Sequence, residues 1–287
     1  MSEQSTAAPA RTRVPRTAEV LRTRRLTPHM IRVVLGGPGL TGFRAGEFTD
    51  HYVKLLFTAD GAPHEGPYDL ERIRAELPPE RWPVTRTYTV RSWDAEAGEL
   101  TIDFVHHGDQ GLAGPWAARA RPGDRIQLLG PGGAYAPSPA ADWHLLAGDE
   151  SALPAISAAL GRLPDGIPAR VVVEVSGVGE EQADLPVREG VELVWVHRRD
   201  GVPGEALVAA VQAAALPPGQ GHVFVHGEAG AVRELRRHLR AQRGLAPEFT
   251  SISGYWRRGD TEERWQSGKR AWNAAIEAEE AAVAGAG

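Results

Sequence analysis

The sequence contains no cysteine. That absence excludes disulfide bonds, thiolate metal sites and cysteine-ligated iron–sulfur clusters. Long apolar runs are also missing, and no segment approaches the roughly 20 residues that a helix needs to cross a bilayer. Residues 1–15 are polar and lack the hydrophobic core of a signal peptide, so we expect a frayed terminus, a cytoplasmic protein and no association with a membrane.

An excess of positive charge is likewise absent. Lysine and arginine number 32 against 37 aspartate and glutamate residues, which gives a net charge of -5. A protein that binds nucleic acid usually carries an excess of basic charge, so we expect no nucleic-acid partner. With 287 residues, 42% of them hydrophobic, the chain is long enough for one large domain or two ordinary ones.

The first half of the chain consists of short strand-like segments separated by turns. Six segments have this pattern: residues 18–26, 30–35, 51–57, 85–92, 100–106 and 125–129. A long polar insertion at residues 60–83 predicts one short helix, over 69–75, and a second helix starts near Ala113. This pattern is typical of a closed antiparallel barrel. We therefore predict a six-stranded antiparallel β-barrel over residues 16–135.

The pattern changes after Pro131-Gly132-Gly133, and residues 136–141 have the composition of a linker. Apolar strands (143–147, 169–175, 191–196, 222–226 and 249–253) then alternate with helical segments (151–160, 204–214 and 228–242). This alternation predicts an α/β domain with a parallel sheet covered on both faces, over residues 142–258. Residues 259–287 predict an amphipathic terminal helix with Trp265 and Trp272, and a loose end from Glu277.

One strand, residues 86–91, carries unusual chemistry. Because strand side chains alternate between two faces, Arg86 and Tyr88 share one face, and Thr87 and Thr89 share the other. A guanidinium, a phenol and a hydroxyl suit a ligand that has a phosphate, a flat ring and a hydrogen-bonding edge. An ordinary half-exposed strand with a salt bridge would show the same pattern.

A glycine-rich loop at residues 106–116 joins a later strand to a helix, and Pro115 suits the first position of that helix. Free backbone N–H groups at a helix start can bind an anion. The loop therefore predicts a pyrophosphate site, with a plain helix-entry loop as the alternative.

A third segment, residues 147–156, follows the first strand of the α/β domain, where dinucleotide phosphates bind in many parallel sheets. Only Gly148 stands in this turn, and Asp149 and Glu150 would repel a phosphate placed on them. The two acids could instead cap the helix that begins there.

Five segments, read in order, carry a resemblance: Arg86-Thr87-Tyr88-Thr89-Val90-Arg91, Asp103-Phe104-Val105-His106-His107-Gly108, Gly130-Pro131-Gly132-Gly133, Gly148-Asp149-Glu150-Ser151-Ala152-Leu153-Pro154-Ala155 and Gly254-Tyr255-Trp256-Arg257. Together they resemble the siderophore-interacting protein family, flavin-dependent ferric-siderophore reductases of the ferredoxin–NADP⁺ reductase superfamily. The resemblance spans residues 16–272. It implies an N-terminal barrel that binds FAD and a C-terminal domain that binds NADPH or NADH.

The resemblance also implies roles for individual residues. Arg86 would bind the FAD phosphate, Tyr88 would contact the flavin–ribityl region, and Thr89 would hydrogen-bond the isoalloxazine edge. Residues 107–116 would hold the pyrophosphate, and residues 148–154 would meet the nicotinamide nucleotide. The cofactor-binding residues expected on this basis are Arg86, Thr87, Tyr88, Thr89, Asp103, Val105, His107, Gly108, Gly111, Ala113, Gly114, Pro115, Trp116, Gly148, Asp149, Glu150 and Ser151.

The implied substrate is a ferric siderophore, and catecholate complexes of this kind are anionic. Basic residues beside the flavin would attract them, and Lys54 and Arg257 are the candidates. An outward-facing strand lysine explains Lys54 equally well, and Lys269 with Arg270 fits a charged helix face. The family pattern leads us to expect a basic residue within residues 130–133, where this sequence has none.

The histidines do not predict a metal site, because the neighbouring His106 and His107 would point apart on a strand. We therefore expect that the protein holds no metal ion. We also expect it to be a monomer. The nicotinamide preference stays open. His197-Arg198-Arg199 follows a parallel strand and favours NADPH through its 2′-phosphate, although the two arginines could equally form a solvated turn.

The function implied is iron acquisition by reduction. NAD(P)H would give a hydride to FAD, and single electrons would then pass to iron(III), so that iron(II) leaves the siderophore in the cytoplasm. No catalytic acid or base is needed. Two alternatives stay open: a general NAD(P)H:flavin or ferredoxin-type oxidoreductase, and a siderophore-binding protein without enzymatic activity.

Overall fold

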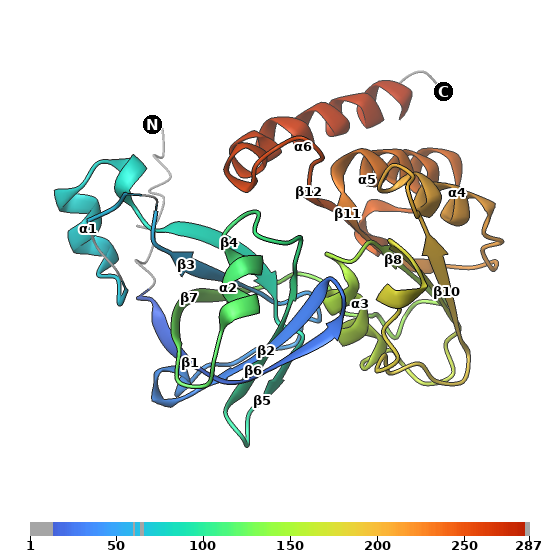
Figure 1. Ribbon diagram of the computed structural model, residues 1–287. Helices are drawn as coiled ribbons and strands as arrows, with labels where there is room; N and C mark the ends of the chain where they lie inside the picture. The colour runs from blue at the N-terminus through green and yellow to red at the C-terminus, as the bar shows by residue number, and fades with distance from the viewer. Residues whose placement is uncertain (1–13, 60, 64–65, 285–287) are drawn as a thin grey trace, which may run out of the picture.

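The computed structural model describes residues 14–59, 61–63 and 66–284. Two β-sheets lie side by side, and a long C-terminal helix extends above the second (Figure 1). The frayed terminus predicted for residues 1–15 lies outside the described residues, apart from Val14 and Pro15. Within the described ranges, no helix is both long and apolar enough to span a bilayer.

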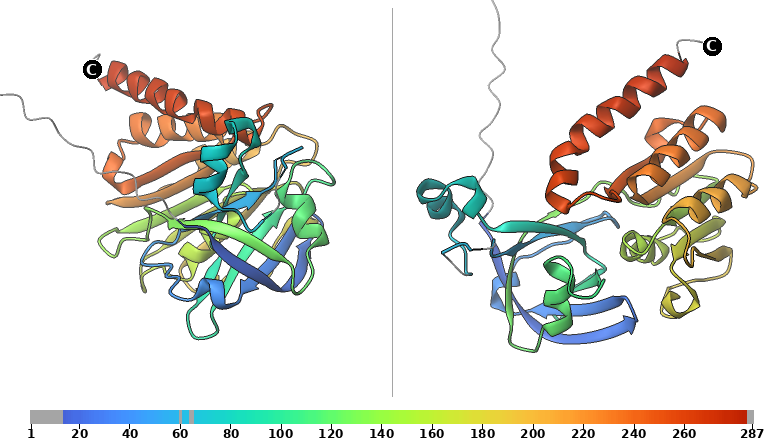
Figure 2. Two further views of the ribbon diagram at one scale, coloured as in Figure 1. Left: turned by 90° about the vertical axis from the view of Figure 1, so that its left-hand side faces the viewer. Right: turned by 45° about the horizontal axis from the view of Figure 1, so that its top comes forward.

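The first sheet has seven strands in the order β4-β3-β7-β1-β2-β6-β5, and every neighbouring pair is antiparallel. The strands are β1 (Arg16–Thr27), β2 (Met30–Gly36), β3 (Tyr52–Phe57), β4 (Val84–Thr89), β5 (Ser92–Asp94), β6 (Glu99–Val105) and β7 (Arg125–Gly132). The two end strands, β4 and β5, are separated in sequence only by Val90 and Arg91, so the chain itself closes the sheet into a barrel (Figure 2).

The barrel prediction is confirmed, but its strand count was too low by one. Residues 85–92 were interpreted as a single strand. In the structure Val90 N donates to the carbonyl oxygen of His51 (2.6 Å), whereas Arg91 N donates to that of Thr101 (2.9 Å). The segment therefore changes partner strand between these two residues, and one predicted strand becomes two.

Apolar side chains from all parts of the barrel fill its interior, among them Leu55, Leu100, Phe104 and Leu128. The helix α2 (Ala113–Arg119) adds Ala113 and Ala117 to this core. The predicted helix in the insertion, α1 (Leu70–Glu76), instead packs Leu70 and Ile73 against Leu56, on the other face of β3. Two 3₁₀ turns, η1 (Pro38–Leu40) and η2 (Pro79–Arg81), complete this half of the chain.

The second sheet has five parallel strands in the order β10-β9-β8-β11-β12, as the α/β prediction requires. They are β8 (Trp143–Gly148), β9 (Ala169–Val175), β10 (Val191–His197), β11 (Gly221–Glu228) and β12 (Thr250–Trp256). Helix α3 (Leu153–Leu160) covers one face, and α4 (Glu205–Ala213) and α5 (Ala229–Arg236) cover the other. Shorter turns are η3 (Val178–Glu180), the π-helical η4 (Arg237–Gln242), which continues α5, and η5 (Pro247–Phe249).

The strand order reverses direction between β8 and β11, and parallel sheets bind ligands at the carboxyl ends of the strands at such a point. Gly148 ends β8 there. A Cβ atom at this position would lie 2.5 Å from the carbonyl oxygen of His226 and from the Cβ of Ala152, so only glycine lets α3 start this close to β11.

The C-terminal helix α6 (Glu262–Ala284) is longer than the sequence predicted. The loose end expected from Glu277 is wrong as far as Ala284, because acidic side chains in this part of α6 are paired. Glu280 forms an ion pair with Arg236 (2.5 Å), and Glu279 pairs with Arg233. A low-complexity composition therefore concealed a helix that is held by residues more than 40 positions away.

Contacts between the two halves gather on the loop after β9. The carboxylate of Glu180, only 6% exposed, accepts hydrogen bonds from the Thr27 hydroxyl (2.5 Å) and from His29, whose Nδ1 lies 2.6 Å away. Arg32 joins Asp103 of the barrel to Asp184 of the α/β domain, with a distance of 2.7 Å to each. These polar contacts fix how the barrel lies against the second sheet.

A buried carboxylate supports the start of α4, and its removal is a test of the fold. Glu174 is fully buried and accepts hydrogen bonds from the backbone N–H groups of Gly204 (2.8 Å) and Leu207 (2.9 Å). We predict that Glu174→Ala lowers the free energy of unfolding by about 3 kcal/mol, because two N–H groups lose a charged acceptor.

Urea unfolding followed by circular dichroism measures this loss. The matched control is Glu192→Ala on β10, an exposed ion-pair residue, which should change the stability by less than about 0.5 kcal/mol. Equal effects of the two substitutions would contradict the role assigned to Glu174.

Candidate functional site

Strand β4 lies at the junction of the two halves, with the chemistry that its sequence predicted. In the register with β3, Arg86 is opposite Leu55 and Tyr88 is opposite Val53. Paired residues share a face of the sheet, so Arg86 and Tyr88 lie on the same face, and Thr87 and Thr89 lie on the other. The predicted alternation along β4 is confirmed.

Tyr88 is packed between the barrel core and α6. Its ring lies 4.4 Å from that of Phe104, centroid to centroid. Burial raises the pKa of the Tyr88 phenol well above its usual range, and the neighbouring Glu262 carboxylate raises it further. The phenol therefore stays protonated and presents a flat neutral ring and a hydrogen-bond donor.

Arg86 meets the first turn of α6. One guanidinium nitrogen lies 2.6 Å from a carboxylate oxygen of Glu263, and 16% of the Arg86 side chain is exposed. A groove of about 360 Å³ lies beside this pair, between η2, β4 and α6, and is lined in part by Trp82, Thr85 and Glu262. Arg86 is the cation at the edge of this groove, and burial raises the pKa of the neighbouring Glu262 carboxyl.

Thr89 connects β4 with the parallel sheet. Its buried side chain lies beside the phenol of Tyr255, near the end of β12. Burial raises the Tyr255 pKa, and its ring lies 4.7 Å from that of His226. Tyr255 belongs to one of the five segments that carry the family resemblance, but it was not among the predicted site residues. The sequence feature that could have identified Tyr255 is an aromatic residue near the carboxyl end of the last parallel strand.

The glycine-rich loop before α2 is open on its outer side. Gly108 and Gly111 both have positive φ, 63° and 78°, and a Cβ atom at either position would meet no atom within 4 Å. Leu112, the N-cap of α2, offers no side-chain hydrogen bond to the helix start. The backbone of this loop is thus accessible, and its role as a pyrophosphate site stays a prediction.

The other residues predicted in this segment serve packing. Ala113, Gly114 and Pro115 are buried, and the ring of Trp116 lies 5.6 Å from that of Phe104. A Cβ at Gly114 would come within 3.0 Å of the carbonyl oxygen of Val105, so glycine here allows α2 to approach β6. Any ligand contact from these positions would come from the backbone.

His107, at the start of the glycine-rich loop, lies near Arg198 of the α/β domain. Partial burial lowers its pKa, and the neighbouring His29 and Arg198 lower it further. Arg198 stands at the carboxyl end of β10, so the loop from the barrel and the ends of the parallel strands meet at one place.

At the turn after β8, the acidic side chains bind the protein itself. Asp149 is 2% exposed. One of its oxygens accepts from Glu228 N (2.9 Å) and from Trp256 Nε1 (2.8 Å), and the other accepts from Ser151 N (2.9 Å). Asp149 therefore ties together the ends of β8, β11 and β12. A nicotinamide contact at this turn remains a prediction, carried by the backbone rather than by these acids.

The contacts of Glu150 change the interpretation of Arg198 as a residue that favours NADPH. Its carboxylate accepts from Ser176 N (3.0 Å) and from Arg198 Nη1 (2.7 Å), and only 14% of the Arg198 side chain is exposed. Arg198 is thus paired with the half-buried carboxylate of Glu150, which weakens it as a sign of NADPH. Arg199 is exposed beside it, with a positive φ of 49°.

Asp103, another predicted cofactor residue, does not contact the candidate site residues Arg86 and Thr89 among the described residues. It is 3% exposed and accepts two hydrogen bonds from Arg32, at 2.7 and 2.8 Å. The structure therefore gives Asp103 a part in an arginine cluster at the cleft between the domains.

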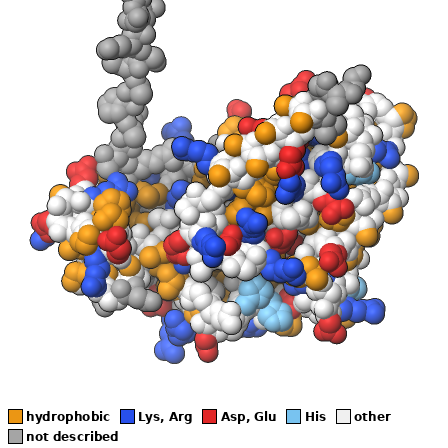
Figure 3. Space-filling view, turned by 90° about the horizontal axis from the view of Figure 1, so that it is seen from above, with side chains coloured by type: hydrophobic (Ala, Val, Ile, Leu, Met, Phe, Trp, Pro, Cys, Tyr) orange, Lys and Arg blue, Asp and Glu red, His pale blue; other side chains and the backbone are white. Residues whose placement is uncertain are grey.

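Of the two predicted substrate cations, Lys54 is exposed opposite Thr87, and Arg257 is 56% exposed, 3.9 Å from Asp260. No contact among the described residues joins Lys54 to Arg257. Lys269, assigned to a solvated helix face, is instead half-buried over the Trp265 ring (5.9 Å), and burial lowers its pKa. Basic and acidic side chains lie close together on the face that carries α6 (Figure 3).

Within the segment 130–133, which lacks the expected basic residue, Gly132 lies close to a neighbouring side chain. The Tyr52 hydroxyl lies over Gly132, where a Cβ would stand 2.6 Å from it. Any side chain at this position would displace the tyrosine.

Comparisons with known proteins agree with this geometry. Two family models match in succession, the siderophore-interacting FAD-binding domain over residues 19–135 and the siderophore-interacting protein model over residues 141–259. An uncharacterized protein of Mycobacterium tuberculosis is 50% identical over 266 residues, which are 88% of this chain and 93% of that protein.

Two relatives with a printed activity are more distant. Ferric vibriobactin reductase ViuB of Vibrio cholerae is 34% identical over 88% of this chain and 92% of its own. The NADPH-dependent ferric-chelate reductase of Escherichia coli is 31% identical over 84% of this chain and 92% of its own.

Among solved structures, the siderophore-interacting protein SipS from Aeromonas hydrophila has a TM-score of 0.76 at 31% identity, covering 90% of this chain and 98% of that one. A siderophore utilization protein from T. fusca has a TM-score of 0.73 at 40% identity, covering 86% and 94%. With both family models matched in order and relatives similar over nearly their full length, the chain belongs to the siderophore-interacting protein family, and its first half is the family's FAD-binding domain.

Proposed function

We propose that this protein is an FAD-dependent reductase that takes electrons from NAD(P)H, reduces the iron(III) of a ferric siderophore and so releases iron(II) in the cytoplasm. One observation carries the proposal. Strand β4 presents Arg86, Tyr88 and Thr89 where the barrel meets the carboxyl ends of the parallel strands, with Tyr255 of β12 beside Thr89. The two relatives named as ferric reductases support it.

The residues present fit FAD. The Arg86 guanidinium suits a diphosphate, since arginine binds phosphate oxygens with paired N–H groups. The groove beside it has Trp82 as a flat apolar wall, and the open backbone near Gly108 and Gly111 leaves space for a phosphate. When bound, FAD supplies the chemistry of accepting a hydride and passing on single electrons.

Tyr88 and Thr89 would then position the ring system. Tyr88 offers a neutral ring that is fixed against Phe104. Thr89 offers a buried hydroxyl beside Tyr255. Because Thr89 is buried and Tyr88 is partly buried, they would exclude water from this part of the site and fix the ring without supplying a proton.

The nicotinamide nucleotide would bind at the strand ends near Gly148, where the sheet order reverses. Asp149 keeps β8, β11 and β12 together there. For the ferric siderophore, the exposed Lys54 and Arg257 and the half-buried Lys269 provide positive charge around the junction. An anionic iron complex would be attracted to these groups.

The first prediction concerns the reaction. The purified protein should be yellow, and anaerobic addition of NADPH or NADH should bleach the flavin absorbance. A ferric catecholate siderophore added next should restore the absorbance while an iron(II) chelator reports one iron(II) per electron delivered. Rapid reduction of a ferredoxin or a dye without siderophore turnover would favour the general oxidoreductase, and siderophore binding without NAD(P)H oxidation would favour a carrier.

The second prediction separates the roles of two β4 residues. Arg86→Ala should weaken FAD binding at least tenfold, which is about 1.4 kcal/mol, since a charged hydrogen bond to phosphate is lost. Thr89→Ala should leave FAD affinity near that of the parent and shift the flavin reduction potential, with Thr89→Ser restoring it. Fluorescence titration of FAD and spectroelectrochemistry measure the two effects, with the exposed Arg119→Ala as control. Unchanged FAD affinity in Arg86→Ala would refute the phosphate role.

The third prediction follows from the ion pair between Arg86 and Glu263. Because a phosphate would have to share or displace the Glu263 carboxylate, Glu263→Gln should tighten FAD binding. The gain should be no more than about fivefold, since the pair is partly exposed and worth at most about 1 kcal/mol. Asp260→Asn, on the same turn of chain, should leave FAD affinity unchanged. Weaker binding in Glu263→Gln would show that the carboxylate supports the cofactor instead.

A further inference from the structure

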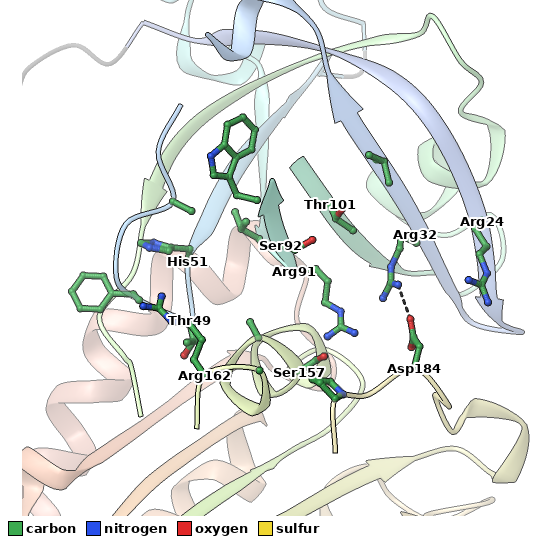
Figure 4. Close-up of a pocket in the computed structure, with 18 of the residues that line it drawn as sticks. Arg24, Arg32, Thr49, His51, Arg91, Ser92, Thr101, Ser157, Arg162 and Asp184 are labelled. Carbon is green, nitrogen blue, oxygen red and sulfur yellow. Dashed lines mark hydrogen bonds and ion pairs between the residues drawn. The ribbon is translucent and has the colours of Figure 1, made fainter. Parts of the chain in front are cut away.

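A second, larger cleft lies between the barrel and helix α3. It encloses about 800 Å³ and shares no lining residue with the groove beside Arg86. Barrel residues such as Arg32, Arg91 and Thr101 line one side, and Ser157 and Arg162 of the α/β domain line the other. Figure 4 shows Arg32 and Arg91 extending from the barrel toward the helix that carries Ser157.

Arg91 is a largely buried cation, and its guanidinium has N–H donors without a close acceptor among the described residues. Only 10% of its side chain is exposed, and its nearest carboxylate is Asp103 at 3.5 Å. That carboxylate already accepts both of its short hydrogen bonds from Arg32. A guanidinium has five N–H donors, and within the described residues none of those of Arg91 has a shorter polar contact. Burial lowers the Arg91 pKa, which marks the cost of leaving this charge poorly solvated.

The cleft also carries more positive than negative charge. Five arginines line it, namely Arg22, Arg24, Arg32, Arg91 and Arg162. Three carboxylates pair with members of this set: Glu99, Asp103 and Asp184.

Two of the arginines account for the remaining charge. Within the described ranges, Arg24 and Arg162 have no carboxylate at ion-pair distance, and Arg162 donates only to the carbonyl oxygen of Glu47 (2.8 Å). Five guanidinium groups against three carboxylates leave the cleft as a whole with a net positive charge of two, and Arg91 adds N–H donors that its shared carboxylate does not use.

The remaining wall of the cleft is apolar and partly aromatic. Trp93 lines it and is held edge-on against Phe43, with ring centroids 4.8 Å apart. Phe48 lines it as well and is 40% exposed. Val34 and Pro186 add aliphatic surface. A site with an apolar wall and a few convergent charged groups is typical of pockets for small organic ligands.

We propose that this cleft binds a small organic dianion with a flat apolar body. One acid group would accept hydrogen bonds from Arg91 and Arg32, the other would meet Arg162 or Arg24, and the body would lie against Trp93 and Phe48. Because Arg91 belongs to the barrel and Arg162 to the turn after α3, the ligand bridges the two domains. This inference concerns a site separate from the flavin groove and does not depend on the proposed reductase activity.

The test is calorimetric titration of the full chain, loaded with FAD so that the flavin phosphate site is filled. Three probes of one shape differ in charge: benzene-1,3-dicarboxylate, benzoate and benzene-1,3-dicarboxamide. We expect the dicarboxylate to bind at least tenfold more tightly than benzoate, and the neutral diamide to show no saturable binding. The dicarboxylate should also raise the melting temperature, because it links two domains.

Variants locate the site. Arg162→Gln and Arg24→Gln are exposed substitutions that should keep the fold, and each should weaken dicarboxylate binding at least threefold, with a larger loss in the double variant. Lys54→Gln and Arg119→Gln remove exposed cations elsewhere and should leave binding unchanged. Circular dichroism checks that every variant is folded.

Several outcomes would overturn the proposal. Equal binding of the dicarboxylate and the diamide would remove the role of charge. Full affinity in the folded Arg24→Gln, Arg162→Gln double variant would remove the site, and an equal loss in Lys54→Gln would place the dicarboxylate at the junction instead. Binding of inorganic phosphate as tight as that of the dicarboxylate would refute the part given to the apolar wall.

Discussion

The exchange of hydrogen-bond partners between Val90 and Arg91 determines much of this molecule. At this step the chain leaves β3 and joins β6, and the barrel closes. The same step directs two sets of side chains to different places. Residues before it, Arg86 to Thr89, meet α6 and β12, whereas Arg91 after it enters the cleft against α3. One change of partner strand thus separates the groove beside Arg86 from the arginine cleft.

Carboxylates organise the second domain, and they do so by accepting hydrogen bonds from the backbone. Asp149 holds three strand ends together, Glu174 caps α4, and Glu228 caps α5 through Gly230 N and Ala231 N. Glu180 performs the equivalent task between the domains. Buried charge is tolerated in each case because several donors converge on it. Acids that stand at ligand-binding positions in the sequence are therefore part of the frame that shapes the site.

The sequence was sufficient for the two-part architecture and for the face of β4 that carries Arg86 and Tyr88. Alternating polarity, turn residues and apolar parallel strands are local signals, and they gave most element boundaries to within a few residues. What escaped prediction depended on distant partners. The split of one strand into β4 and β5 requires knowledge of which strands lie alongside. The pairing of Arg198 with Glu150, 48 positions apart, turned an apparent phosphate ligand into half of an ion pair. The order of residues 277–284 and the contact of Glu263 with Arg86 likewise come from pairing across the fold.

Helix α6 has a consequence that follows from where its two ends are held. Its last turns are joined to α5 and η4 of the α/β domain by Glu279 and Glu280, and its first turn reaches across to Arg86 of the barrel. The C-terminal part of the helix is therefore fixed to the α/β domain, and its N-terminal tip contacts the barrel. Any rotation of one domain against the other moves that tip, so the ion pair between Arg86 and Glu263 depends on the angle between the domains.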